Sequence, residues 1–255
     1  MKTKKIKVDL ALVENGLASD LAHARSMISC GLIFLGDKQI KNNSYVDEDE
    51  LLKVGFRIKD KKDNVSRGGI KLSSVFDAVD IDVKDKMCMD VGASTGGFTE
   101  LLLKKGASKV YSIDVGKNLL DYKLRVNEKV VVLEGINARF LDQDPVIKNT
   151  IPDSSVDVVV MDLSFISLKL VLPRVLTYMK PGATIIPLIK PQFEVEAKEV
   201  PQGGVVRDED VINRVLLDMR RFIENLGFNV MELIPSKIQG ACGNQEYFFV
   251  CLLTG

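Results

Sequence analysis

The stretch MCMDVGASTGGF, residues 87–98, decides the fold of this chain. Its pattern is that of a buried strand, a glycine-rich turn over residues 92–97 and a helix that follows directly. Glycine has no Cβ, so the backbone of this turn can approach a ligand closely. The N-terminus of the following helix leaves N–H groups free to bind it. The stretch therefore predicts the first strand–turn–helix unit of a nucleotide-binding α/β fold.

A second predicted strand, residues 110–114, ends in Asp114 about twenty residues further on, where an acid can accept both hydroxyls of a ribose. A dinucleotide site would need a glycine in the middle of the turn, so that the pyrophosphate could rest on the helix. Here the middle position is Ser94, and the acidic Asp90 precedes the turn. Both residues suit a cationic nucleoside without phosphates, such as S-adenosylmethionine (SAM). The alternative is a plain strand–helix turn that binds no ligand.

Composition narrows the class of protein. The 255 residues suffice for one large domain, or for one large and one small domain. No apolar run approaches the ~20 residues of a membrane helix, and the N-terminus lacks the pattern of a signal peptide. The four cysteines are far apart and His23 is the only histidine, which predicts a reduced, cytoplasmic protein without a disulfide framework or a metal site.

Charge gives a weaker indication. The net charge is zero, and the first 71 residues hold 14 Lys and Arg against 10 Asp and Glu. This modest excess does not by itself indicate a nucleic-acid-binding protein.

The first part of the chain is predicted as a small α+β domain. Helices are expected over residues 9–15 and 20–30, the second capped by Ser19 and ended by Gly31. Short strands are expected over 32–35, 38–40 and 52–58. Polar residues then indicate a domain boundary. The predicted organisation is a domain over 1–60, a linker over 61–66 and a larger domain over 67–255.

The larger domain alternates strands and helices. Beyond the turn, strands are predicted over residues 130–133, 156–161, 183–189, 230–234 and 247–253, and helices over 65–79, 167–179 and 208–226. This alternation predicts an α/β fold with a doubly wound, mostly parallel sheet. The run VDVVVM, residues 156–161, is apolar and β-branched, as in a strand buried on both faces.

Three charged residues fall at the ends of predicted strands, namely Asp162, Lys190 and Glu246, and Lys71 lies on a preceding helix. Ligands bind at the carboxyl ends of strands in such sheets. Methyl transfer to a ribose hydroxyl requires alignment and removal of the hydroxyl proton. A lysine can remove it if its pKa, ~10.4 when unperturbed, is lowered. Which lysine would do so stays open, and the alternative is that these charges only cap strands or face solvent.

The order helix, helix, turn and small sheet resembles the S-four-type RNA-binding domain of a small-subunit ribosomal protein and of pseudouridine synthases. The resemblance rests on Lys7, Val8, Asp9, Leu12, Gly16, Ser19, Ala22, Arg25, Ile28, Gly31 and Gly36. Asp20 stands where this family usually has arginine, which removes one expected phosphate contact. Solvated surface charges are the alternative to RNA contacts. The expected RNA-binding residues are Lys5, Lys7, Arg25, Lys38, Lys41 and Arg67.

Lys71, Asp162, Lys190 and Glu246 match the K-D-K-E tetrad of FtsJ-type ribose 2′-O-methyltransferases. Over nearly its whole length the chain resembles the TlyA family of rRNA methyltransferases, also called hemolysins. Beside the turn, the runs that carry this resemblance are SRGG (66–69), NAR (137–139), DLSFIS (162–167), KPQFE (190–194), GGVV (203–206) and GNQEYF (243–248).

The resemblance implies a Rossmann-like, SAM-dependent methyltransferase that modifies a cytidine 2′-hydroxyl of rRNA, with the N-terminal domain docking on the ribosomal subunit. In this family the longer members, which carry a C-terminal extension, are credited with both ribosomal subunits. Because this sequence ends directly after its last strand, the resemblance implies a large-subunit target. The alternatives are a membrane-active cytolysin and a non-catalytic ribosome-assembly or RNA-binding factor. The implied SAM-binding residues are Asp90, Gly92, Ala93, Ser94, Thr95, Gly96, Gly97, Phe98, Asp114, Val115, Asn137 and Asp162.

Overall fold

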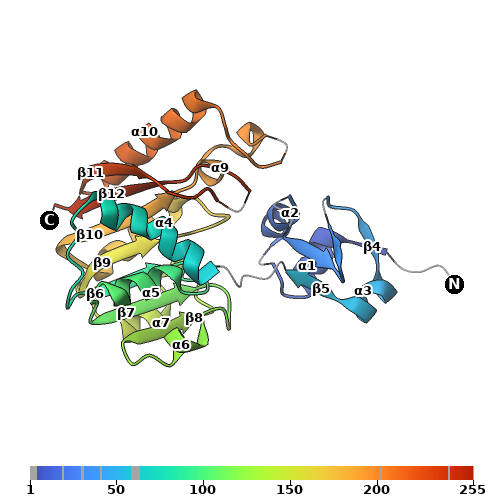
Figure 1. The fold of residues 1–255 in the computed structure, drawn as a ribbon, viewed down its shortest axis with the longest axis horizontal. Helices are drawn as coiled ribbons and strands as arrows, with labels where there is room; N and C mark the ends of the chain where they lie inside the picture. Colours follow the sequence, from blue (N-terminus) through green and yellow to red (C-terminus); the bar gives the residue numbers. More distant parts are fainter. Residues whose placement is uncertain are drawn as a thin grey trace. The chain divides into compact units, whose positions relative to one another are not determined.

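The computed structural model describes residues 5–18, 20–29, 32–40, 42–58, 64–201, 203–240 and 242–254. The chain forms two compact units (Figure 1), one made of Met1–Lys61 with Lys198–Val205 and the other of Lys62–Ala197 with Val206–Gly255. Helix α4, Asn64–Ala78, begins inside the segment 61–66 that was predicted as a linker. The predicted helix over 65–79 is confirmed, so residues 64–66 belong to it.

Among its described residues, the small unit contains two antiparallel sheets and the helices α1, α2 and α3. Strands β1 and β4 pair with each other, and β2 pairs with β3 on one side and β5 on the other. Helices α1 and α2 pack together through buried residues such as Leu12, Ala24 and Ile28. The elements are β1 Lys5–Lys7, α1 Val8–Glu14, α2 Leu21–Ser29, β2 Ile33–Leu35, β3 Lys38–Gln39, β4 Tyr45–Asp47, α3 Glu48–Val54 and β5 Phe56–Ile58.

The predicted order of two helices and a small sheet is confirmed, but one predicted strand is wrong. Residues 52–54 belong to helix α3, and only 56–58 form a strand. The side chain of Asp47 caps α3 by accepting the N–H of Asp49, and acids fill its first turn, where the helix dipole favours them. Gly55 then ends the helix with φ +66°. Ser19, Cys30 and Gly31, predicted to bound the second helix, lie outside the described residues.

The large unit is built on a seven-stranded sheet in the order β11-β12-β10-β9-β6-β7-β8. The five strands from β10 to β8 are parallel, and β12 is antiparallel to both of its neighbours. The predicted doubly wound, mostly parallel sheet is confirmed. Its strands are β6 Met87–Val91, β7 Lys109–Asp114, β8 Val130–Glu134, β9 Val156–Met161, β10 Met179–Ile189, β11 Phe228–Pro235 and β12 Tyr247–Leu253.

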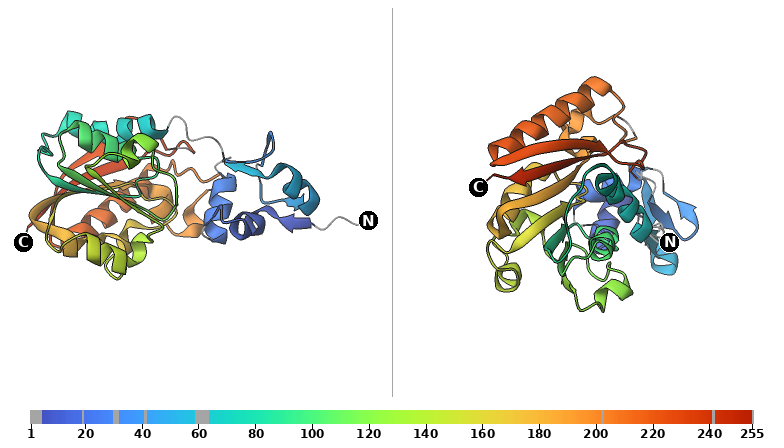
Figure 2. Two further views of the ribbon diagram at one scale, coloured as in Figure 1. Left: turned by 90° about the horizontal axis from the view of Figure 1, so that it is seen from below. Right: turned by 60° about the vertical axis from the view of Figure 1, so that its left-hand side comes forward.

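Helices cover both faces of this sheet (Figure 2). On one face, α4 and α5 Gly97–Lys104 contribute Leu72 and Leu102 to a core that also contains Val158. On the other, α7 Pro145–Thr150, α8 Leu172–Val175 and α10 Glu209–Asn225 pack against a core that contains Val159. Successive residues of β9 thus enter opposite cores, which explains its uninterrupted apolar run. The remaining short helices are α6 Tyr122–Arg125, η1 Ala138–Phe140, η2 Leu168–Leu170, η3 Leu176–Tyr178, α9 Pro191–Glu194 and η4 Ala197–Glu199.

Two sequence expectations fail in the large unit. The single helix predicted over 167–179 is broken into η2, α8 and η3, because Pro173 lacks an N–H and occupies the start of a helix rather than its interior. Strand β10 accordingly begins at Met179. Cys88 and Cys251 are free and buried, whereas Cys242 is disulfide-bonded, so the expectation of reduced cysteines is wrong at that position. No described helix has the length and apolar character needed to cross a membrane.

Candidate active site

The turn between β6 and α5 needs glycine for steric reasons. Gly92 has φ +88°, and a Cβ there would lie 2.5 Å from the backbone oxygen of Asp162 at the end of β9. Gly96 has φ +97°, forms the N-cap of α5 and would clash with Leu124 if it carried a Cβ. The close backbone approach predicted from sequence is thus present, and at Gly92 it joins the turn directly to Asp162.

Asp90, near the end of β6, connects the strand to the start of helix α5. Its side chain is fully buried, and Oδ2 accepts the Thr99 N–H at 2.9 Å and the Thr99 hydroxyl at 2.7 Å. Oδ1 is buried and has no hydrogen-bond partner among the described residues. Burial raises the pKa of Asp90 to about 7 although Thr99 stabilises the charged form. A cationic group held at the turn would favour ionised Asp90, so this carboxyl fits the positively charged end of SAM.

Asp114 ends β7 beside the turn. Its Oδ2 accepts the Ser94 N–H and its Oδ1 accepts the Gly116 N–H, both at 2.8 Å. Each carboxylate oxygen can accept a second hydrogen bond, so these contacts leave capacity for a ribose. Val115 follows with an exposed side chain, and Asn137 caps η1 by accepting the Arg139 N–H. The roles predicted for these residues in SAM binding stay predictions.

Sequence reasoning missed Glu134 at the end of β8. Its carboxylate accepts the N–H groups of Asn118, Leu119 and Leu120 at 2.7, 3.0 and 3.2 Å, and Arg125 donates to it at 2.6 Å. Burial acts to raise the pKa of Glu134, but these donors outweigh burial and lower it. The only signal in the sequence was an acid that ends an otherwise apolar strand.

The segment held by Glu134 returns to the glycine turn. Asp121 donates its N–H to the backbone oxygen of Thr95 at 3.1 Å. A Cβ on Gly96 would lie 2.8 Å from Leu120 and 2.2 Å from Leu124. The loop after Asp114 and the turn after β6 therefore form one packed body.

The four residues of the predicted tetrad come together in the structure. Lys71 Nζ lies 2.7 Å from Glu246 Oε2 and 3.6 Å from Asp162 Oδ2, and Lys190 Nζ lies 2.6 Å from Asp162 Oδ1. The Lys190 and Glu246 side chains are only 6% and 3% exposed. Asp162 is thus shared by both lysines, which lie on elements far apart in the sequence.

Electrostatics distinguishes the members of this cluster. Burial acts to lower the pKa of Lys71, but Asp162 and Glu246 together outweigh burial and raise it. Burial acts to raise the pKa of Asp162, but Lys190 and Lys71 outweigh burial and lower it. Lys71 is therefore held as a cation and Asp162 as an anion.

Hydrogen bonds connect the run DLSFIS, residues 162–167, to the run KPQFE, residues 190–194. Lys190 Nζ lies 2.8 Å from the Ser164 hydroxyl oxygen, to which it donates. At the other end of the two runs, Glu194 accepts the Ser167 hydroxyl at 2.6 Å and the Leu168 N–H at 2.8 Å. These contacts limit the positions open to the Lys190 amine. Ser164 and Glu194 had been predicted only as parts of runs, without individual roles.

The loop before β12 presents Glu246. A Cβ on Gly240 would lie 2.4 Å from Glu246 Oε1, so the loop closes tightly over the carboxylate. Arg67, on the helix that carries Lys71, donates to the backbone oxygen of Gln239 at 3.1 Å. A Cβ on Gly68 would lie 3.1 Å from the Cα of Gly97 in α5, which favours glycine at position 68, whereas a Cβ on Gly69 would make only an ordinary contact, at 3.5 Å.

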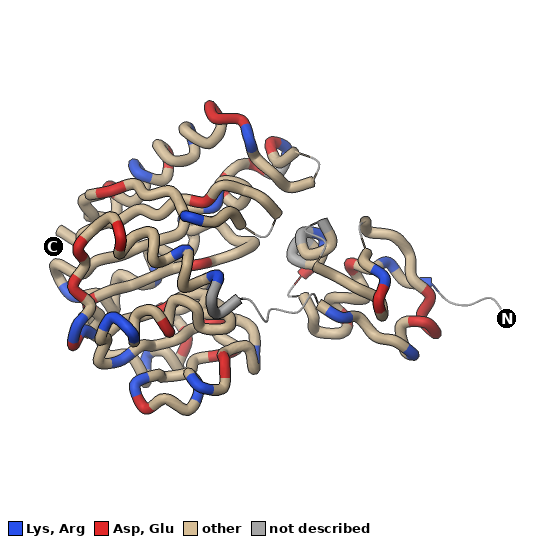
Figure 3. Tube along the Cα trace, in the orientation of Figure 1, with Lys and Arg blue, Asp and Glu red and all other residues tan. Residues whose placement is uncertain are grey.

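The predicted RNA-binding residues of the small unit differ in their surroundings. Arg25 pairs with Asp9 at 2.7 Å, and Asp9 is almost completely buried, so this arginine has a structural role. Lys5 and Lys38 line one cavity, while Lys7 lies over the ring of Tyr45. Positive and negative residues are interspersed along this unit (Figure 3). Lys41 lies outside the described residues.

Comparisons with known proteins show the family of the chain. Residues 64–252 match the family described as FtsJ-like methyltransferase. The 16S/23S rRNA (cytidine-2′-O)-methyltransferase TlyA of Mycobacterium tuberculosis is 40% identical over 96% of this chain and 89% of its own length. Hemolysin A of Brachyspira hyodysenteriae is 35% identical over 95% of this chain and 98% of its own length.

A solved structure from Streptococcus thermophilus that carries a hemolysin name is 32% identical, with a TM-score of 0.69 over 99% of this chain and 90% of that one. The family match covers most of the chain, and the relatives align along nearly all of it. The chain therefore belongs to the FtsJ-like methyltransferase family, within the group whose members are named TlyA or hemolysin A.

Proposed function

We propose that this protein transfers a methyl group from SAM to the 2′-hydroxyl of a cytidine in rRNA. The observation that carries the proposal is the contact between the glycine turn and the charged tetrad. The Asp162 N–H donates to Val91 at 3.1 Å, and the Asp162 backbone oxygen leaves no room for a side chain on Gly92. A nucleoside held at the turn would therefore lie beside the tetrad.

The residues present fit SAM. The turn offers close backbone approach at Gly92, Asp90 offers a buried carboxyl that a cation would ionise, and Asp114 has unused acceptor capacity at the neighbouring strand end. When bound, SAM supplies a methyl group on a positively charged sulfur. These three features, on β6, the turn and β7, support a phosphate-free cationic cofactor over a dinucleotide.

The two lysines have different roles in the proposal. Lys71 lies between two carboxylates and stays charged, so it anchors Glu246 and Asp162. Lys190 shares one carboxylate and contacts the Ser164 hydroxyl, and we assign it as the proton acceptor. With SAM bound and supplying the methyl group, the Lys190 amine would take the proton that the attacking 2′-hydroxyl loses. Asp162 then stabilises the resulting Lys190 cation.

The nature of the acceptor rests on the relatives. The Mycobacterium tuberculosis relative is named for both 16S and 23S rRNA, and a Campylobacter jejuni relative, 35% identical over 72% of this chain, is named for 23S rRNA alone. Both names include 23S rRNA, so we propose the large ribosomal subunit as the target, with the small unit docking on its rRNA. A cytoplasmic location follows from this partner.

The experiment is methyl transfer from labelled SAM to isolated ribosomal subunits that lack the modification. Wild type and Lys190→Ala are run side by side, and the products are mapped by mass spectrometry of RNA fragments. The expected result is 2′-O-methylcytidine in the large-subunit rRNA from wild type alone. Lys180→Ala is a matched control, because Lys180 lies on the same strand but pairs with Asp157 at 2.7 Å, away from the tetrad.

Other outcomes would redirect the proposal. Label on the small subunit alone would overturn the large-subunit assignment. SAM binding without label on either subunit would favour a non-catalytic assembly factor. Lysis of erythrocytes by the purified Lys190→Ala protein would favour a cytolysin whose action does not depend on methyl transfer.

A further inference from the structure

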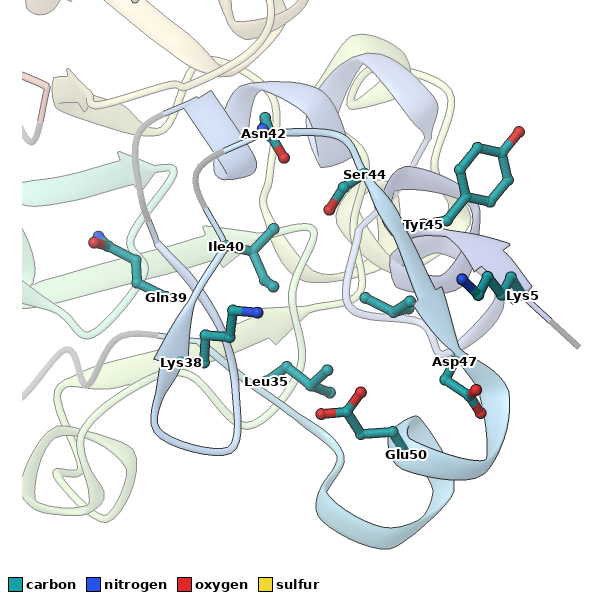
Figure 4. A pocket seen from close by; sticks show the side chains of 11 residues that line it. Lys5, Leu35, Lys38, Gln39, Ile40, Asn42, Ser44, Tyr45, Asp47 and Glu50 are labelled. Carbon is teal, nitrogen blue, oxygen red and sulfur yellow. The ribbon is translucent and has the colours of Figure 1, made fainter. Parts of the chain in front are cut away.

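The small unit contains a cavity that the methyltransferase reaction does not use. It has a volume of about 460 Å³ and lies between strands β1 and β4, the β2–β3 hairpin and helix α3 (Figure 4). The apolar part of its wall comes from Leu35, Ile40 and Val46, which are themselves buried in the unit. All of its lining residues fall between Lys5 and Glu50, so it shares no residue with the tetrad.

Charged side chains of opposite sign enter this cavity. Lys38 and Glu50 reach into it from different sides, and the Ser44 hydroxyl and Asn42 amide lie at its border (Figure 4). Within the described part of the chain, the Lys38 and Glu50 side chains form neither a hydrogen bond nor an ion pair. Opposite charges that face one cavity without pairing are available to a ligand.

This combination selects the chemistry of the ligand. Glu50 would repel a bare phosphate, and a phosphate would gain nothing from the apolar wall. A nucleotide suits both the apolar wall and charges of both signs, because its base is flat and apolar on its faces, its phosphate attracts Lys5 and Lys38, and an exocyclic amino group can donate to Glu50. Asp47 is a second acid on the lining. The cavity volume is within the usual range of small-molecule sites, about 300–1,000 Å³.

We propose that this cavity binds one unpaired nucleotide of RNA, with a preference for bases that carry an exocyclic amino group. The base must be unpaired, because in a duplex its edge is already paired and its faces are stacked. The inference rests on the proposed function, in which RNA is the partner. It adds a site of base recognition to a unit that was predicted only to contact phosphates.

The test uses the full-length chain and fluorescently labelled, single-stranded oligo(A) and oligo(U), with affinity measured by anisotropy. Adenine carries an exocyclic amino group and uracil does not, and neither is the base of the proposed methyl acceptor. Wild type is expected to bind oligo(A) about tenfold more tightly, the size of one hydrogen bond to a charged acceptor. Glu50→Ala is expected to abolish this preference.

Asp49→Ala is the matched control, because Asp49 lies on the same helix and carries the same charge but does not line the cavity. It should keep the preference for oligo(A). Ser44→Tyr, which fills the cavity, should lose it as well. Equal binding of the two oligonucleotides by wild type, or a preference that survives both Glu50→Ala and Ser44→Tyr, would overturn the proposal.

The outcome is independent of catalysis. A protein that methylates rRNA but shows no base preference refutes the cavity proposal alone. A protein that keeps the Glu50-dependent preference but transfers no methyl group refutes the catalytic proposal alone.

Discussion

The tetrad of the large unit and the cavity of the small unit both gather charged residues, but they do so in opposite ways. In the tetrad each lysine is paired with a carboxylate within 2.7 Å, and the side chains are largely buried. In the cavity, Lys38 and Glu50 stay apart and form no pairs with described residues. Chemistry requires charges that are already in place, since reorganisation would add to the barrier. Recognition leaves charges open, because the ligand itself completes the pairs.

The largest effect is expected when Asp162, the tetrad residue that contacts both lysines, is substituted. Asp162→Asn removes the carboxylate that both lysines contact, which leaves Lys190 without a counter-charge. We expect the rate of methyl transfer to fall by about 10²–10⁴-fold, the usual contribution of a positioned proton-transfer group. Single-turnover kinetics with labelled SAM and unmodified rRNA measure this loss.

The affinity of Asp162→Asn for SAM, measured by calorimetry, shows whether the variant loses the chemical step or the binding of SAM. Asp157→Asn, on the same strand β9 but paired with Lys180, should keep the wild-type rate. A rate for Asp162→Asn within threefold of wild type would show that the pairing in the tetrad is not required for chemistry.

A second prediction concerns the packed body around the glycine turn. Glu134→Ala leaves three backbone N–H groups and Arg125 without their acceptor. The Asn118 bond is exposed, but the other three are part-buried. Donors that lose a partner away from solvent cost about 1–3 kcal/mol, so we expect the free energy of unfolding of the large unit to fall by about 2 kcal/mol. SAM affinity should fall as well, because the released loop contacts Gly96 and Thr95.

Urea denaturation and SAM calorimetry check this prediction. Glu128→Ala, an exposed acid near the same loop, is the control and should change neither quantity. Lower stability with unchanged SAM affinity would restrict Glu134 to a role in folding.

The third prediction uses the pKa of Asp90, which burial raises to about 7 from the usual ~3.9. Between about pH 4 and pH 7 the folded protein retains a proton that the unfolded chain has lost. The contribution of Asp90 to stability therefore decreases as the pH rises through this window. Asp90→Asn cannot ionise, so its stability relative to wild type should improve by about 1–3 kcal/mol from pH 5 to pH 8.

Urea denaturation at the two pH values provides the measurement. The pKa of Asp157 is lowered, because burial is outweighed by Lys180 and the Met87 N–H. Its contribution is complete above the unfolded pKa, so Asp157→Asn should shift stability equally at pH 5 and pH 8. An equal shift for Asp90→Asn would mean that buried Asp90 is ionised throughout this range.

The smallest expected effects concern Arg25 and Lys38 of the small unit, which we expect to act on stability and on RNA binding, respectively. Arg25→Ala removes the partner of buried Asp9 and should lower the stability of this unit by about 1 kcal/mol, with RNA affinity unchanged. Lys38→Ala should leave stability unchanged and reduce the salt dependence of RNA binding by about one phosphate contact. Thermal unfolding and salt-dependent anisotropy measure the two. Loss of RNA affinity in Arg25→Ala at unchanged stability would contradict this division.

Several features of the fold could be predicted because they depend on residues close together in the sequence. The turn at residues 92–97, the strand over 156–161 and the helix begun by Asp208 each have a local cause in glycine, in β-branched residues or in a capping acid. Predictions failed where a single residue altered the local pattern. Pro173 broke a predicted helix, and Asp47 with the acids after it made a helix of residues predicted as a strand.

By itself, the sequence determined the strand–turn–helix unit and the alternating architecture, because residue type and spacing encode them, and its resemblance to FtsJ-type methyltransferases predicted the four tetrad residues. Only the tertiary structure decided that Asp162 is shared by Lys71 and Lys190, that Glu134 holds the loop beside the turn and that Lys38 and Glu50 face one cavity. These contacts depend on strand order and chain reversal. Strand order and chain reversal bring together residues that are far apart in the sequence, and the distance between two residues along the chain does not predict their distance in space.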